Sequence, residues 1–186
     1  FDAVKVEAAI RELLIGIGEN PDREGLAQTP ARVAKSYAEI FGGIHQTAQD
    51  VLTTTFSLGH DELVVVRDIP IYSTCEHHLL PIVGKAHVAY ISNGTVVGLS
   101  KMNRVVDYFA KRPQVQERLT NEIRDCIQDT LNPLGVAVVI ECSHLCMQMR
   151  GIQKQNSATT TSAFTGEFLK DSTRKEFISL IGTKLH

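Results

Sequence analysis

Strand-like segments in this chain are joined by hairpins or separated by pairs of helices, and this order limits the folds that it can adopt. The segment 63–73 is rich in β-branched residues, and segments 85–91 and 96–100 predict a hairpin that turns at Asn93-Gly94. Single strands and single helices do not alternate as they do in a parallel sheet of β-α-β units. The pattern therefore predicts an α+β fold with a mainly antiparallel sheet.

Helical periodicity marks much of the remaining chain. The helical segments are 1–18, 31–41, 102–131 with a break near Pro113, and 173–185. Thr29 is the predicted N-cap of the second helix, with Pro30 at its first position. Further strands are predicted over residues 135–149 and 164–168, and residues 44–60 are expected to be irregular. We expect an N-terminal helical region with a connector over residues 1–60, followed by an α+β domain over residues 61–186.

Charge and hydropathy exclude two classes of partner. The formal net charge is −2, which argues against non-specific binding to nucleic acid because that needs an excess of Lys and Arg on one face. No apolar run reaches about 18 residues, so no membrane span is expected. Three of the four cysteines have a histidine within three residues, which favours metal binding or catalysis over a disulfide framework. This usage is typical of a reducing compartment and predicts a cytoplasmic protein.

Two Cys/His clusters carry the strongest chemical signal. Cys75-x-x-His78 has the spacing of a metal-binding pair, although a buried cysteine followed by surface histidines is the simpler interpretation of this motif alone. In the second cluster, strand alternation is expected to put Cys142, His144 and Cys146 on one face. Cys142 lies 64 residues after His78. The two clusters are therefore expected to meet across neighbouring strands.

Thiolate and imidazole ligands together favour zinc. The number of candidate ligands, which include His77, exceeds the four of a closed structural site and the three of a catalytic site, so spacing alone does not select among them. If three bind, the remaining histidines are placed to transfer protons near a water whose pKa the metal lowers to about 7.

Positive charges form a third pattern. Ser100, Lys101 and Arg104 lie at the start of a predicted helix, which is a suitable anion site. Further candidates are Arg150, four residues beyond Cys146, and the pair Arg32 and Lys35 near the start of an earlier helix. For any one of these side chains, a solvated surface position is the simpler interpretation.

Three long motifs resemble the GTP cyclohydrolase I family: STCEHHLLPIVGKAHVAYI, VVGLSKMNRVVDYFAKRPQVQERLT and HLCMQMRGIQKQNSATTTSAF. PDREGLAQTPARVAKSY is similar to the same family. The resemblance covers nearly the whole chain. It implies that residues 61–186 form a catalytic domain with the tunnelling fold, in which paired helices lie on one side of the antiparallel sheet, and that residues 1–60 form an N-terminal helical extension and connector. It also implies a homodecamer of two face-to-face pentamers with active sites between subunits.

The resemblance implies conversion of GTP and water to 7,8-dihydroneopterin triphosphate and formate, the first step of folate- or tetrahydrobiopterin-type pterin biosynthesis. Metal-hydroxide attack on guanine C8 would precede ring opening, formate release and ring closure. A feedback regulatory protein, and with it allosteric control, is a further partner that such a family member allows. The implied roles are zinc ligation by Cys75, His78 and Cys146, proton transfer by His77 and His144, guanine reading by Gln116 and Glu117, and phosphate or ribose binding by Ser100, Lys101, Arg104, Arg150, Arg32 and Lys35.

Two alternatives to this interpretation use the same residues. A nitrile reductase of the same fold would use a cysteine nucleophile and a nicotinamide cofactor without zinc. A zinc-stabilised oligomeric scaffold would bind a nucleotide without turning it over.

On local evidence alone, Gln116-Glu117 is interpreted as the first turn of a helix, where a carboxylate complements the helix dipole.

Overall fold

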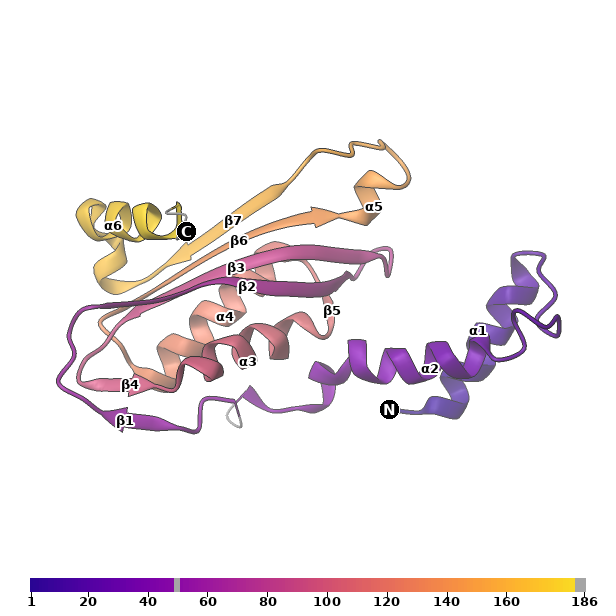
Figure 1. Ribbon diagram of the computed structural model, residues 1–186, viewed down its shortest axis with the longest axis horizontal. Coiled ribbons are helices and arrows are strands. Elements are labelled where there is room, and N and C mark those ends of the chain that lie inside the picture. Colours follow the sequence, from indigo (N-terminus) through magenta and orange to yellow (C-terminus); the bar gives the residue numbers. More distant parts are fainter. Residues whose placement is uncertain (49–50, 183–186) are drawn as a thin grey trace.

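A five-stranded sheet with the strand order β5-β2-β3-β6-β7 organises the protein (Figure 1). The structure is a computed structural model that describes residues 1–48 and 51–182. Neighbouring strands are antiparallel except β5, which runs parallel to β2. The strands are β2 (Leu63–Cys75), β3 (Pro81–Ile91), β5 (Pro113–Gln114), β6 (Gly135–His144) and β7 (Thr159–Phe164). The predicted α+β class with a mainly antiparallel sheet is confirmed.

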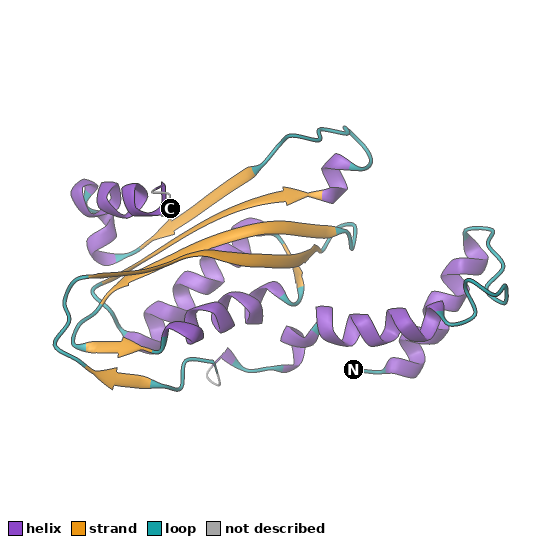
Figure 2. Ribbon diagram, viewed as in Figure 1, coloured by secondary structure: helices purple, strands orange, loops and turns teal. Residues whose placement is uncertain are grey.

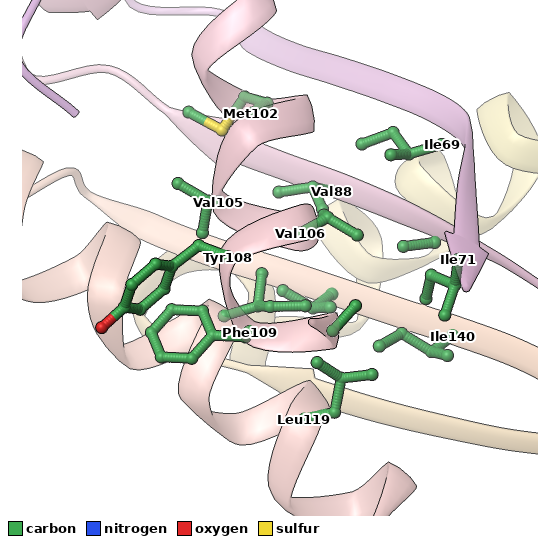
Figure 3. Packing of buried hydrophobic residues seen from close by; sticks show 14 of the residues in the cluster. Ile69, Ile71, Val88, Met102, Val105, Val106, Tyr108, Phe109, Leu119 and Ile140 are labelled. Carbon is green, nitrogen blue, oxygen red and sulfur yellow. The ribbon is translucent and has the colours of Figure 1, made fainter. Parts of the chain in front are cut away.

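Two helices cover one face of this sheet, as predicted. α3 (Leu99–Ala110) and α4 (Gln116–Leu131) flank the break at Pro113. Alternate strand residues such as Val88 and Ile140 pack against Val105 and Leu119 from these helices (Figure 3). Burial of apolar side chains at about 25 cal/mol per Å² is the main force that holds such layers together.

The opposite face has a smaller core. Ala89, Ala137 and Val139 meet Phe168 and Phe177, which come from η3 (Gly166–Leu169) and α6 (Asp171–Gly182). Because strand side chains alternate between faces, the neighbours of these residues in sequence belong to the larger core. The predicted final helix is confirmed to residue 182, and its predicted residues 183–185 lie outside the described part of the chain.

The N-terminal helices form an arm that extends away from the sheet (Figure 2). α1 (Ala3–Gly16) packs against α2 (Thr29–Ile40), and no residue of α1 is buried. The helices agree with the prediction, but α2 includes Thr29 and its N-cap is Gln28, so the predicted cap was one residue late. The apolar residues Leu13 and Ile17, which recur at helical spacing in the predicted helix 1–18, remain exposed in the single chain.

The predicted hairpin at Asn93-Gly94 is wrong in its pairing. β4 (Thr95–Val97) does follow this turn, but it pairs with β1 (Thr55–Ser57) and not with β3. β3 has no free edge to offer, because it pairs with β2 on one side and β6 on the other. The segment 44–60, expected to be irregular, therefore contributes a short strand as well as the end of η1 (Gly42–His45).

Two predicted strands end elsewhere. The strand expected over 135–149 stops at His144, and Leu145–Gln148 form the short helix α5. The strand expected over 164–168 lies earlier, as β7, and residues 166–169 form η3. Gly166 has φ +53°, and a Cβ there would lie 2.0 Å from the carbonyl oxygen of Leu134. This close approach requires glycine and ends the strand.

Within residues 1–48 and 51–182, no helix combines the length and hydropathy that a membrane span requires.

Candidate metal centre and active site

The turn between β2 and β3 brings Cys75 and His78 together. The N–H of Leu79 donates to the carbonyl of Cys75 (2.8 Å), and the N–H of Cys75 donates to the carbonyl of Leu80 (2.9 Å). Leu79 takes a left-handed φ of +52°, which reverses the chain. As a result, Sγ of Cys75 lies 3.7 Å from Nδ1 of His78.

Cys146 joins this pair from the neighbouring end of β6. His144, the last residue of β6, is opposite Ile82 near the start of β3. The first turn of α5 then carries Cys146 to the pair, so that the candidate ligand atoms of Cys75, His78 and Cys146 lie within 4.8 Å of one another. These three residues form the candidate metal group. The expected meeting of the two clusters is confirmed. The expected strand alternation is wrong for Cys146, because this residue is helical.

Cys142 takes no part in that group. Its thiol is buried against Gly84, where an added Cβ would lie 2.6 Å from Sγ, and burial raises the pKa of Cys142 to about 12. Burial also raises the pKa of Cys146, with a further contribution from the adjacent Cys75 thiol. Two cysteines and one histidine are ligands that zinc prefers, and three ligands leave one position for water. The donor set therefore fits a catalytic zinc ion.

His144 is held by a buried amide. Its Nε2 lies 2.7 Å from Oε1 of Gln116, the first residue of α4. Burial lowers the pKa of His144, and the negative charge of the exposed Glu117 opposes that shift. The side chain of Gln116 is only 1% exposed. Gln116 and Glu117 therefore lie beside His144 but face opposite ways, Gln116 into the core and Glu117 toward solvent.

His77 is exposed beside the metal group. Its ring is edge-on to that of His78, with 6.3 Å between the centroids, and its Nε2 lies 3.8 Å from a carboxylate oxygen of Glu76. Arg118 on α4 donates to the same Glu76 carboxylate and holds the pKa of Glu76 below its usual range. Arg118 was not found from the sequence, because no spacing links it to residue 76.

The predicted phosphate-binding residues are divided between distant places. Arg150 is exposed near Cys146, on whose thiol its charge acts. In contrast, Ser100 and Lys101 lie in the first turn of α3, and Arg104 lies near its middle. The other end of α3 is at the metal side, where Ser73 donates to the carbonyl of Ala110 (2.7 Å). The 12 residues of α3 span about 18 Å.

The arm carries the last two predicted residues. Arg32 and Lys35 are exposed on α2, which packs on α1 and η1 and extends away from the sheet (Figure 1). Within one chain, the structure thus joins the metal group to His77, His144, Gln116, Glu117 and Arg150, but not to the five other predicted residues.

The fold and the converging ligands define a candidate metal-dependent enzyme on an antiparallel α+β scaffold. The sequence profile described as GTP cyclohydrolase I matches residues 6–182. This chain belongs to the GTP cyclohydrolase I family, and the tunnelling fold and enzyme class predicted from the sequence are confirmed.

Several relatives cover almost the whole chain. Proteins named GTP cyclohydrolase 1 from Streptomyces griseus and Streptomyces coelicolor are 57% and 58% identical over 97% of this chain and 91% of their own. The protein of that name from Corynebacterium aurimucosum is 59% identical over 97% of this chain and 94% of its own. A crystal structure of an archaeosine synthase QueF-like protein covers 56% of this chain and 93% of its own at 20% identity, but its TM-score of 0.46 is too low to carry an argument.

Proposed function

We propose that this chain is a zinc-dependent GTP cyclohydrolase I that converts GTP and water to 7,8-dihydroneopterin triphosphate and formate. The observation that carries the proposal is the convergence of Cys75, His78 and Cys146, whose candidate ligand atoms lie within 4.8 Å of one another. His144, two residues before Cys146, is held by the buried amide of Gln116. Membership of the family and the names of its relatives support the same reaction. The product would enter folate- or tetrahydrobiopterin-type pterin biosynthesis.

Cys75, His78 and Cys146 would hold the zinc ion. Bound there, zinc would supply a Lewis acid that activates water at neutral pH. The turn that closes at Leu79 and the first turn of α5 fix the ligands from two separate elements. Such a site is built only when β2, β3 and β6 are assembled.

His144 would act as general acid and base in the first hydrolysis. As water adds to C8 of guanine, a proton delivered to N7 balances the charge that builds on the five-membered ring. Cleavage of the C8–N9 bond then gives a formamide. A second water attacks the formamide carbon, and cleavage of its C–N bond releases formate and leaves a free amine.

His77 would serve the later proton transfers. The ribose opens, rearranges to a ketone, and condenses with the free amine, with loss of one water molecule. The reaction therefore consumes one water in total, since two are added and one is expelled. His77 is exposed beside His78 and is free to face a substrate in these steps.

Glu117 would read the guanine base. Its exposed carboxylate can accept hydrogen bonds from N1–H and the 2-amino group, a donor pair that adenine lacks. Gln116 was expected to share this role. Its amide is buried and hydrogen-bonded to carbonyl groups in the core.

The triphosphate would be bound by Lys101, Arg104, Arg150, Arg32 and Lys35, with Ser100 at the phosphate or ribose end. Because the start of α3 lies far from the metal group of its own chain, a neighbouring subunit would supply part of this clamp. The exposed apolar residues of α1 support self-association. We therefore propose a homodecamer with shared active sites in the cytoplasm, and a feedback regulatory protein as a further partner.

We also propose that residues 61–186 are the catalytic domain and that residues 1–60 are the N-terminal region. β1 belongs to the N-terminal region by sequence, although it pairs with β4 of the catalytic domain.

Metal removal and replacement test the proposal. Protein stripped with a strong chelator should lose GTP turnover, and added zinc should restore it. GTP turnover that persists without metal would contradict the proposal. A metal-free protein that reduces a nitrile with a nicotinamide cofactor would instead support the reductase alternative.

A further inference from the structure

We propose that Gln116 is a positioning residue that keeps a proton on Nε2 of His144, so that Nδ1 is the ring atom that exchanges protons with the substrate. The inference deepens the proposed function, because it depends on His144 as the acid and base. It assigns Gln116 a role through His144 in place of a direct contact with guanine.

The surroundings of Gln116 fix which end of its amide is the NH2 group. The Nε2 atom lies 3.2 Å from the carbonyl oxygen of Ile140 and 2.9 Å from that of Thr159. Oγ1 of Thr161 is a third neighbour, at 3.1 Å. Carbonyl oxygens can only accept hydrogen bonds, so the atom that faces them must be the donor. The amide oxygen Oε1 therefore faces the other way.

That oxygen determines the protonation of His144. Oε1 of Gln116 lies 2.7 Å from Nε2 of His144, and an amide oxygen can only accept. The imidazole must therefore donate from Nε2. A neutral imidazole has a single N–H, so Nδ1 carries the lone pair and is the base. Because Nε2 is engaged by Gln116, Nδ1 is the ring atom left to exchange a proton with a substrate.

The amide is prevented from turning over. The side chain of Gln116 is 1% exposed, and it lies between α4 and the strands β6 and β7. Thr120, one turn later on α4, donates to the carbonyl of Gln116 (2.7 Å) and lies 2.7 Å from Oγ1 of Thr161. Reversing the amide would point its oxygen at two carbonyl oxygens and leave these buried acceptors without a donor, which is unfavourable.

The first test examines the unmodified, zinc-loaded protein. Nitrogen-15 NMR of histidine-labelled protein at about pH 8, above the ordinary histidine pKa of about 6.5, distinguishes the two ring nitrogens. The His144 signals are those that disappear in His144→Gln. We expect the Nε2–H tautomer. The Nδ1–H tautomer, or comparable amounts of both, would overturn the proposal whether or not the protein converts GTP.

The second test compares two variants that alter the same buried network. Gln116→Met keeps the length of the side chain but removes the acceptor for His144, whereas Thr120→Val removes a hydroxyl that does not contact His144. We expect Gln116→Met to lower kcat about tenfold to a hundredfold, as loss of an orienting partner does, with little change in KM and a mixture of His144 tautomers. Thr120→Val should match the wild type in kcat and tautomer.

Two results would overturn the assignment. If Gln116→Met and Thr120→Val had the same kcat, Gln116 would have only a structural role. If Gln116→Met raised KM with kcat unchanged, the residue would contact guanine directly, since that pattern marks lost ground-state binding. Metal content, measured for both variants, separates these effects from loss of zinc.

Discussion

Sγ of Cys75 lies 3.7 Å from Nδ1 of His78, across a turn in which Leu79 takes a left-handed φ of +52°. The turn places both candidate ligands at the end of β2, next to the end of β6 that leads into α5 and Cys146. The metal group therefore depends on strand register, because a shift of one residue between β3 and β6 would separate Cys146 from Cys75 and His78.

Cys146→Ser should lose bound metal and GTP turnover together, because a hydroxyl is a much poorer zinc ligand than a thiolate. Cys126→Ser is the matched control, since Cys126 is a half-buried thiol on α4 outside the metal group. Elemental analysis and formate release measure the two quantities. A Cys146→Ser protein with a full complement of zinc would show that the ligand set is wrong.

His144→Ala should keep its zinc and its fold but lower the rate of ring opening by about 10² to 10⁴, the usual contribution of general acid–base catalysis. His45→Ala, which removes an exposed histidine outside the metal group, should have no effect. Single-turnover measurements of formamide formation report the step directly. Near-normal turnover by His144→Ala would refute the acid–base assignment.

Arg118→Gln should weaken zinc binding about tenfold, the lower end of the effect of residues that support metal ligands. Arg118 donates to Glu76, which lies between the ligands Cys75 and His78 in the turn. Arg124→Gln on the same helix is the control, because Arg124 pairs with Asp125 instead. Competition with a zinc-sensitive dye gives both affinities. Equal affinities in the two variants would mean that the ion pair does not support the turn.

The phosphate clamp should be shared between subunits. Arg104→Ala and His144→Ala are each expected to abolish most activity, for lack of phosphate binding and of proton transfer. Co-assembled in one oligomer, the two variants should regain a measurable part of it, because some sites would combine an intact His144 with a neighbour's intact Arg104. If each chain used its own Arg104, mixing would restore nothing.

Stability should fall as the pH drops through the ordinary histidine range because of His87. This side chain is buried and accepts from the N–H of Asp68 (3.1 Å) through Nδ1. Burial lowers the pKa of His87, with Asp68 and Glu141 opposing the shift and Lys85 and Arg67 adding to it. Between the lowered pKa of His87 in the folded chain and about pH 6.5, the unfolded chain therefore binds a proton that the folded chain does not.

His87→Gln can keep an acceptor for Asp68 without titrating. Urea unfolding between about pH 5 and pH 7.5 should show less loss of stability in acid for this variant than for the wild type. Identical pH profiles would mean that other groups cause the acid sensitivity.

The sequence was sufficient for the helices, the main strands and the convergence of Cys75, His78 and Cys146, because each depends on local pattern or on a long motif. It was insufficient where contacts between distant segments decide which strands pair and where a strand ends. Asn93-Gly94 predicted a hairpin, but β3 already had two partners, so β4 paired with β1. Cys146 was assigned to a strand face, although α5 begins one residue earlier.

The role of Gln116 was also hidden in the sequence. Because Gln116 stands next to Glu117 in the sequence, both were interpreted as polar residues that contact guanine. In the structure, Gln116 shares the buried face of α4 with Leu119, Thr120 and Ile123. That spacing of three and four residues was a signal for an inward-facing amide. Its partners on β6 and β7 could not be known without the sheet register.

The most direct test of the central claim follows both products of the reaction with GTP, in the presence and absence of a strong chelator. We predict formate and a pterin with its characteristic ultraviolet absorbance in equal amounts, and neither when the metal is removed. Failure of the zinc-loaded oligomer to form either product would contradict the proposed function and favour a scaffold that only binds the nucleotide.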